Sequence, residues 1–191
     1  MKKFVVLILM VSMLFSLSGC GSSAEEANGG GEKSQYAQAL DVWNAIVASY
    51  GEGELFSVYG GDSENAVMDA PGKFDVSKTE ELEYTLRLPQ SQFDNIDDAA
   101  SMVHMMNANT FTGAVYHLKD GTDLESFTDE VKTNVLATQW LCGFPDTLVI
   151  INVDGAYVIT AFGEAGIMET FKANALSALS GAEVILETPI A

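Results

Sequence analysis

The chain has 191 residues, of which 27 are acidic, nine are basic and two are histidine, and its net charge at neutral pH is −18. So acidic a surface repels nucleic acids and anionic lipid headgroups, which excludes nucleic-acid binding and favours cationic peptides, metal ions or simple solubility. Two histidines and two cysteines are too few for a conventional histidine metal cluster or a disulfide framework.

The first twenty residues predict a lipoprotein signal peptide. Two lysines precede an apolar run from Phe4 to Leu17, which fits a signal-peptide core and falls short of the ~20 residues that a membrane-spanning helix needs. The segment Leu17-Ser18-Gly19-Cys20 fits all four positions of a lipobox. We therefore expect residues 1–19 to be removed and Cys20 to carry a lipid on the extracytoplasmic face of the cell membrane. An ordinary secretory signal with a chance cysteine is the alternative.

Residues 20–34 predict a flexible, lipid-anchored tether. The segment is rich in glycine, serine and glutamate and has no apolar periodicity, so it should behave as a coil that reaches on the order of 20 Å. Cleavage leaves 172 residues, with seven basic residues against 27 acidic ones and a net charge of −20. This length predicts a single domain over residues 35–191.

A helix is expected directly after the tether. Ser34 could cap a helix whose apolar residues recur at spacings of three and four from Tyr36 to Tyr50, with Gly51 as the stop. The region of residues 52–98 has weaker patterns. Within it, apolar residues alternate with polar ones from Leu82 to Leu88, as in a half-buried strand.

The C-terminal half predicts two β-β-α units. Strands are expected over residues 100–106 and 111–118 with a helix over 123–139, and again over 147–153 and 156–162 with a helix over 165–179. Asp154-Gly155 suits a tight hairpin turn. The predicted fold is α+β, with a four-stranded antiparallel sheet and its helices on one face, including the N-terminal helix. The two units are either a duplication or two generic amphipathic motifs.

The lipobox, the acidic tether and the segments Trp140–Pro145 and Val153–Val158 together resemble a family of uncharacterised Gram-positive lipoproteins that carry a C-terminal domain of unknown function. The resemblance covers roughly residues 35 to 185. It implies an α+β domain anchored outside the cytoplasm, and it brings no catalytic residues with it.

Few residues suggest catalysis. With Cys20 lipidated, Cys142 is the remaining thiol, and its apolar neighbours predict a small buried hydrophobe with a raised pKa. A nucleophile pair of Cys142 with His117 is the enzymatic alternative. Asp120, Asp123 and Glu125 could suit calcium, but their spacing is not that of an EF-hand, and a turn with a helix N-cap at Asp123 is the simpler prediction.

One strand suggests a metal. On a strand, Met102, His104 and Met106 share a face, and thioether and imidazole groups suit Cu(I) outside the reducing cytosol. Neighbours two apart on a strand are separated by about 6.6 Å, so His104 and Met106 could share an ion, whereas all three residues would need the strand to bend. The alternative is that the methionines fill an irregular core.

Taken together, these patterns predict a monomeric lipoprotein with no cofactor and no catalytic residues. Its expected role is to bind or scaffold a protein, peptide or small ligand. The alternatives are a metal-handling lipoprotein that uses His104 and Met106 and, third, a thiol-dependent enzyme.

Overall fold

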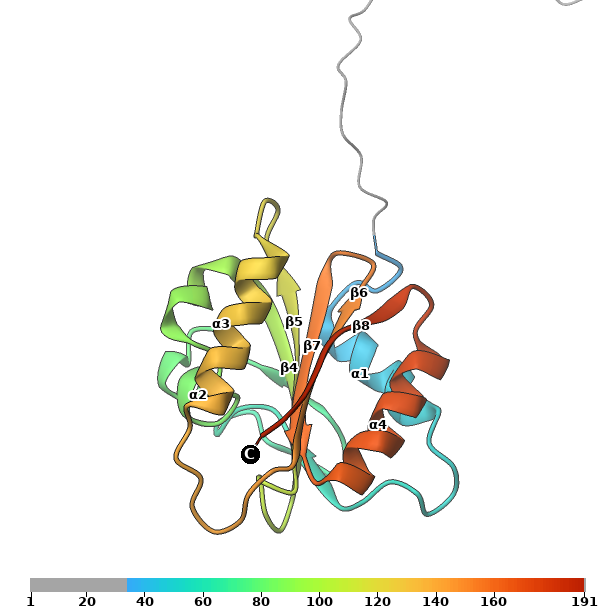
Figure 1. Ribbon diagram of the computed structural model, residues 1–191. Coiled ribbons are helices and arrows are strands. Elements are labelled where there is room, and N and C mark those ends of the chain that lie inside the picture. The colour runs from blue at the N-terminus through green and yellow to red at the C-terminus, as the bar shows by residue number, and fades with distance from the viewer. Residues whose placement is uncertain (1–33, 191) are drawn as a thin grey trace, which may run out of the picture. The chain divides into compact units, whose positions relative to one another are not determined.

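The computed structural model describes residues 34–190, so the predicted signal peptide and Cys20 lie outside the described residues. Four α-helices, one 3-10 helix and eight strands follow one another along this part of the chain (Figure 1). Their bounds, in chain order, are α1 Ala39–Ala48, β1 Val58–Gly60, β2 Val67–Met68, β3 Gly72–Phe74, α2 Thr79–Tyr84, η1 Gln90–Asn95, β4 Ile96–His104, β5 Phe111–Leu118, α3 Leu124–Leu136, β6 Thr147–Val153, β7 Tyr157–Gly163, α4 Ala165–Ala178 and β8 Ala182–Pro189.

The strands form one antiparallel sheet of eight strands, in the order β2-β1-β4-β5-β7-β6-β8, with β3 paired to β4. The α+β class is as predicted, but the prediction of a four-stranded sheet is wrong. The four expected strands form the centre of the sheet, β4-β5-β7-β6. Three short strands extend it beyond β4 and the C-terminal strand β8 extends it beyond β6.

Helices cover both faces of the sheet, and the prediction that they share one face is also wrong (Figure 1). The apolar residues of α1 and α4 pack into one buried cluster, and those of α2 and α3 pack into a second cluster. Strands β5 and β7 are buried along almost their whole length, because each supplies side chains alternately to the two clusters.

Helix α1 places the indole of Trp43 at the centre of the first cluster. The Trp43 ring lies 6.3 Å from the Phe111 ring and 5.8 Å from the Phe171 ring, between centroids. Its Nε1 donates to the carbonyl oxygen of Ala100 at 3.1 Å. The helix begins at Ala39, whose N–H donates to a carboxylate oxygen of Asp98 at 2.7 Å. This capping group comes from β4, not from Ser34 as predicted.

The predicted hairpin between β6 and β7 is confirmed. Asp154 and Gly155 have φ values of 53° and 69°, the left-handed pair that a type I′ turn requires. By contrast, the strand predicted from Leu82 to Leu88 is wrong, because residues 79–84 form α2. Leu82 and Leu86 are buried while Tyr84 is exposed, which is the spacing of a helix followed by a turn.

Two glycines allow β1 and β3 to share one edge of β4. Strand β1 pairs with Val103 and His104 of β4, and β3 pairs with residues 99–101. Where the chain passes between these segments, a Cβ on Gly60 would lie 2.1 Å from the backbone nitrogen of Gly72. Only glycine leaves room for backbones so close together.

Candidate functional site

The two ends of the sheet differ in what they expose. At one end, here called the tether end, Ser34 lies beside the β6–β7 turn and its hydroxyl donates to Asp154 at 3.4 Å. At the other end, the loop end, the segments of residues 105–110 and 137–146 meet. This end lies at the bottom of Figure 1. The chain from Cys20 therefore joins the described domain at the end opposite these loops.

Three large apolar side chains stand exposed at the loop end. The exposed fractions are 83% for Met106, 80% for Leu141 and 73% for Phe144. We call these three residues the apolar tip. Single exposed apolar residues are ordinary, but several gathered on adjoining loops are typical of an interaction surface.

Two asparagines hold the loops of the apolar tip together. The side-chain amide of Asn107 donates to the carbonyl oxygen of Cys142 at 2.9 Å, and that of Asn109 donates to the carbonyl oxygens of Leu141 and Gly143, both at 2.9 Å. These bonds fix a backbone in which Cys142 has a φ of 60°, a conformation that costs a non-glycine residue of order 1–3 kcal/mol.

Trp140 anchors the base of the longer loop. Its ring centroid lies 5.2 Å from that of Phe162, and the guanidinium of Arg87 lies 5.3 Å from its ring centroid on the α3 side of the sheet. The loop is therefore fixed at its start by aromatic packing and along its length by the asparagine amides. The backbone that carries the exposed side chains is thus held in place, which lowers the entropic cost of ordering the loop on binding.

The prediction that Cys142 is buried is wrong, because the thiol is exposed. Nor does the structure bring Cys142 to His117. His117 pairs with Tyr157 at the tether end of β5, whereas Cys142 is bonded to the loop that precedes Phe111. The six residue steps of strand from Phe111 to His117 span about 20 Å. His117 instead contacts Asp97, with 2.5 Å between Nδ1 and Oδ1.

The exposure of Cys142 predicts its reactivity. We expect iodoacetamide to alkylate Cys142 in the folded protein nearly as fast as in urea, because the residue is exposed. The measurement is the time course of alkylation by mass spectrometry at neutral pH, with and without denaturant. Alkylation that becomes rapid only when urea unfolds the domain would contradict the exposed loop.

The structure separates the three residues of the suggested metal strand. Met102 is fully buried in the first cluster, and β4 ends at His104, so Met106 lies in the loop beyond it. Nδ1 of His104 accepts the backbone N–H groups of Met106 and Asn107 at 3.2 and 3.3 Å. Only Nε2 of His104 and the sulfur of Met106 remain for a shared ion.

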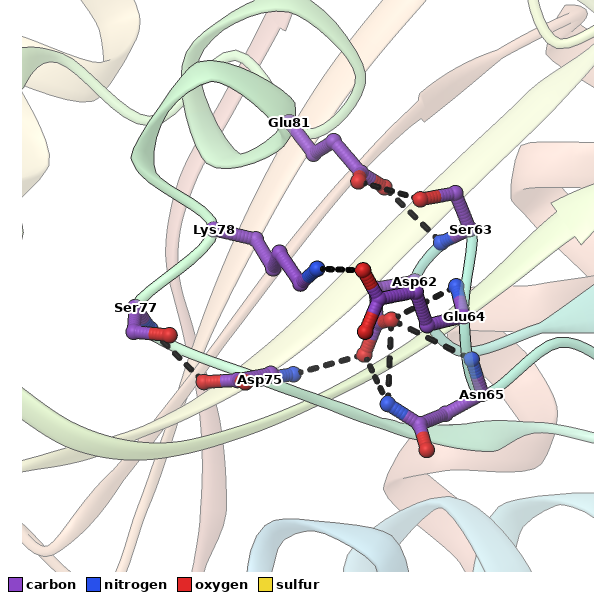
Figure 2. Close-up of polar contacts among 8 residues, drawn as sticks. All are labelled: Asp62, Ser63, Glu64, Asn65, Asp75, Ser77, Lys78 and Glu81. Atoms are coloured by element: carbon purple, nitrogen blue, oxygen red, sulfur yellow. Dashed lines mark hydrogen bonds and ion pairs between the residues drawn. The ribbon is translucent and has the colours of Figure 1, made fainter.

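A separate polar network surrounds Asp62, which is 2% exposed, and Figure 2 shows that its members come from the 62–65 turn, the end of β3 and the start of α2. The Asp62 carboxylate accepts N–H groups from Glu64, Asn65 and Asp75, all within 3.2 Å, and both oxygens also accept the Asn65 amide. Because these bonds use the acceptor capacity of the carboxylate, the network is structural. It holds the turn against the sheet.

Replacing Asp62 with asparagine should destabilise the domain in a pH-dependent way. Burial alone would raise the pKa of the Asp62 carboxyl, but the bonds from the Asn65 side chain and from three backbone N–H groups outweigh it and hold the pKa below its usual range. A lowered pKa in the folded state gives stability that is present above the unfolded-state pKa of about 3.9 and is lost as the pH falls through the folded-state value.

At pH 7 we expect Asp62→Asn to lower the unfolding free energy by about 1–3 kcal/mol, because an amide N–H would face backbone donors. Urea unfolding of both proteins between pH 3 and pH 7 measures this difference. It should shrink below about pH 4, where the unfolded carboxyl is protonated. A difference that is constant over this range would show that the carboxylate charge is irrelevant.

The predicted N-cap at Asp123 is confirmed, since its carboxylate accepts the N–H groups of Glu125 and Ser126 at 3.0 and 3.2 Å. Across residues 34–190, no three histidine, cysteine or carboxylate side chains are grouped so as to hold a metal ion. Within the same range, no helix has the length and apolar character needed to cross a bilayer.

Comparisons of this chain with models of known protein families, with curated protein sequences and with solved structures find no match.

Proposed function

We propose that the protein is a lipid-anchored, non-enzymatic binding domain on the extracytoplasmic face of the cell membrane, and that its apolar tip binds another protein. The observation that carries this proposal is the exposure of Met106, Leu141 and Phe144 on loops braced by asparagine amides. Large apolar side chains on a backbone that needs no further ordering suit the centre of a binding surface.

The position of the apolar tip supports the same proposal. The tether of residues 20–34 joins the domain at the end of the sheet where Ser34 contacts Asp154, and the tip lies at the opposite end. The chain that enters at Ser34 is therefore not attached beside the tip. The acidic surface disfavours burial of the domain in anionic headgroups, so a protein partner fits better than the bilayer itself.

The exposed thiol of Cys142 allows a direct test. In the lipidated protein, the sulfur of Cys20 forms a thioether with the lipid, so Cys142 carries the free thiol. A membrane-impermeant maleimide that carries benzophenone should label Cys142 on intact cells, and light should then cross-link it to the protein partner. The measurement is the mass of the adduct on a denaturing gel, followed by peptide identification.

Leu141→Ser with Phe144→Ser should retain labelling of Cys142 and lose at least about 90% of the adduct, since hot-spot losses of 2 kcal/mol or more reduce occupancy by more than tenfold. As a control, Cys142→Ser with Leu176→Cys moves the thiol to an exposed position on α4 and should abolish this adduct. Labelling only after lysis would overturn the extracytoplasmic location. Cross-links to lipid alone would overturn the protein partner.

The anchor is tested separately by Cys20→Ala. This variant should leave the membrane fraction or remain as an unprocessed precursor, because the thioether lipid cannot form. Mass spectrometry of the mature amino terminus checks the cause. An unmodified amino terminus at another residue in the parent protein would show that the lipoprotein prediction is wrong.

A further inference from the structure

Strand β8 forms an open edge of the sheet. It pairs with β6 on one side, and within residues 34–190 no strand pairs with its other side. Along that edge, backbone N–H and C=O groups on alternate residues point outward. Such an edge is a template for a further strand unless it is covered.

A bulge at Ile185 gives this edge an apolar face. Ile150 pairs with Leu186 and Ile151 pairs with Val184, so Ile185 is the extra residue. As a result, Ile185 and Leu186 both pack against the cluster on the α3 side of the sheet, where a regular strand would place only one of them. Both side chains are only partly buried.

These two side chains form one side of a groove whose other side is α3. The groove has a volume of about 420 Å³ and is lined by Leu124, Glu125, Thr128 and Asp129 of α3 and by Ile185 and Leu186 of β8. The groove lies beside β8, the strand with the open edge. A groove of this size beside an unpaired strand accepts the side chains of a peptide whose backbone pairs with that strand.

The charged residues in the groove lining are both acidic. Glu125 and Asp129 are exposed in its lining. Glu183 pairs with Asn152 and Leu186 pairs with Ile150, two residues apart on β6, so Glu183 and Leu186 lie on the same face of β8. The lining contains no lysine or arginine, and Lys132 is one helical turn further along α3. An apolar floor with an acidic rim favours a cationic, apolar ligand.

The same charges argue against two occupants from this protein itself. The chain's own tether carries Glu25, Glu26 and Glu32 against a single Lys33, so the acidic rim would repel it. Pairing of β8 with β8 of a second copy would bring the carboxylates of both grooves together, which disfavours self-association. A segment of a different protein is what remains.

We propose that the groove between α3 and β8 binds an extended segment of another protein, which adds to β8 as a further strand. On the face of the added segment that meets α3, one apolar residue has a lysine or arginine two positions before it and two positions after it. Residues two apart on a strand share a face and lie about 6.6 Å apart. The central apolar side chain then enters the groove, and the basic ones meet Glu125, Asp129 and Glu183. This site is separate from the apolar tip.

The test uses the full lipidated protein in detergent micelles and a fluorescein-labelled probe peptide of sequence Thr-Lys-Thr-Ile-Thr-Lys-Thr. Fluorescence anisotropy should show saturable binding that weakens between 50 mM and 500 mM salt. The same peptide with glutamate in place of lysine should not bind. Equal binding of the two peptides, or binding of neither, would overturn the proposal.

Peptide N-methylation tests whether a strand is added. In a strand, the N–H groups of the lysines and the isoleucine point to one edge and those of the threonines to the other. Methylation of one set should abolish binding, and methylation of the other should leave the affinity within about twofold. Equal effects of both sets would contradict strand addition.

A matched pair of variants locates the site. Glu125→Gln with Asp129→Asn should weaken the probe peptide by about fivefold to tenfold, the effect of two surface charge pairs. Glu164→Gln with Glu169→Gln removes the same charge at exposed positions flanking and within α4 and should change the affinity by less than twofold. If both double variants weakened the binding of the probe peptide equally, the binding site would lie elsewhere. A dimer in light scattering that Leu186→Arg dissociates would show that a second copy occupies the groove, and would overturn the proposal.

Discussion

Trp43→Ala should lower the unfolding free energy by about 3–5 kcal/mol, the cost of removing a large aromatic side chain from a packed core. Trp43 is 0% exposed and lies against the rings of Phe111 and Phe171. Its loss would leave a cavity between α1, α4 and the sheet, and would also leave the carbonyl oxygen of Ala100 without its indole donor. Urea unfolding followed by circular dichroism measures the change.

Trp43→Phe separates the two contributions. It keeps most of the aromatic contact and loses the hydrogen bond to Ala100, so we expect a cost of about 1–3 kcal/mol. If Trp43→Ala cost less than about 1 kcal/mol, the value of an ordinary surface change, α1 would not be packed on the sheet as described.

Gly60→Ala should lower the unfolding free energy about as much as Trp43→Ala does, but through a steric clash. The added Cβ would meet the backbone nitrogen of Gly72 at 2.1 Å and the carbonyl oxygen of Ser101 at 2.4 Å. Neither atom belongs to a side chain that could turn away, so β1 and β3 would have to separate. We expect a loss of about 3–5 kcal/mol or a failure to fold, as for other severe overpacking.

The matched control for Gly60→Ala is Gly166→Ala. Gly166 lies in α4, and a Cβ there would have no atom within 4 Å. Since alanine is the better helix former, we expect Gly166→Ala to stabilise the domain by up to about 1 kcal/mol. The measurement is the melting temperature of the parent protein, Gly60→Ala and Gly166→Ala. Equal melting temperatures for Gly60→Ala and the parent would contradict the crossing of β1 and β3.

The sequence predicts the centre of the sheet well because the signals there are local. Apolar runs set β5 and β6, Asp154-Gly155 sets the turn before β7, and helical spacing sets α3 and α4. The apolar runs of the central strands also indicate that both faces of the sheet are covered. Residues 157–163 and 147–153 are almost continuously apolar, which is typical of strands buried on both sides rather than one.

The edges of the sheet were harder to predict. Strands β1, β2 and β3 have only two or three residues each, and their pairing depends on contacts with β4 that lie far away in sequence. Strand β8 is longer, but its bulge breaks the alternation of period two that identifies a half-buried strand.

The apolar tip was missed for a physical reason as well. Trp140, Leu141 and Phe144 look like core residues by type, and Trp140 does pack inward. Gly143 and Pro145 beside them indicate a loop, and loops lie at the surface. Asparagine is a common turn residue, and the bonds of Asn107 and Asn109 to the neighbouring loop depend on tertiary structure that no local pattern contains.

The division of the interior by the sheet has a consequence for how this domain tolerates change. The cluster beneath α1 and α4 and the cluster beneath α2 and α3 share strands but no side chains. Energetic effects of substitutions usually add when the residues have no common partners. Mutations at Trp43 and at Phe127, on opposite sides, should therefore combine additively. Substitutions in the groove beside α3 should then leave unchanged the stability that the opposite cluster supplies.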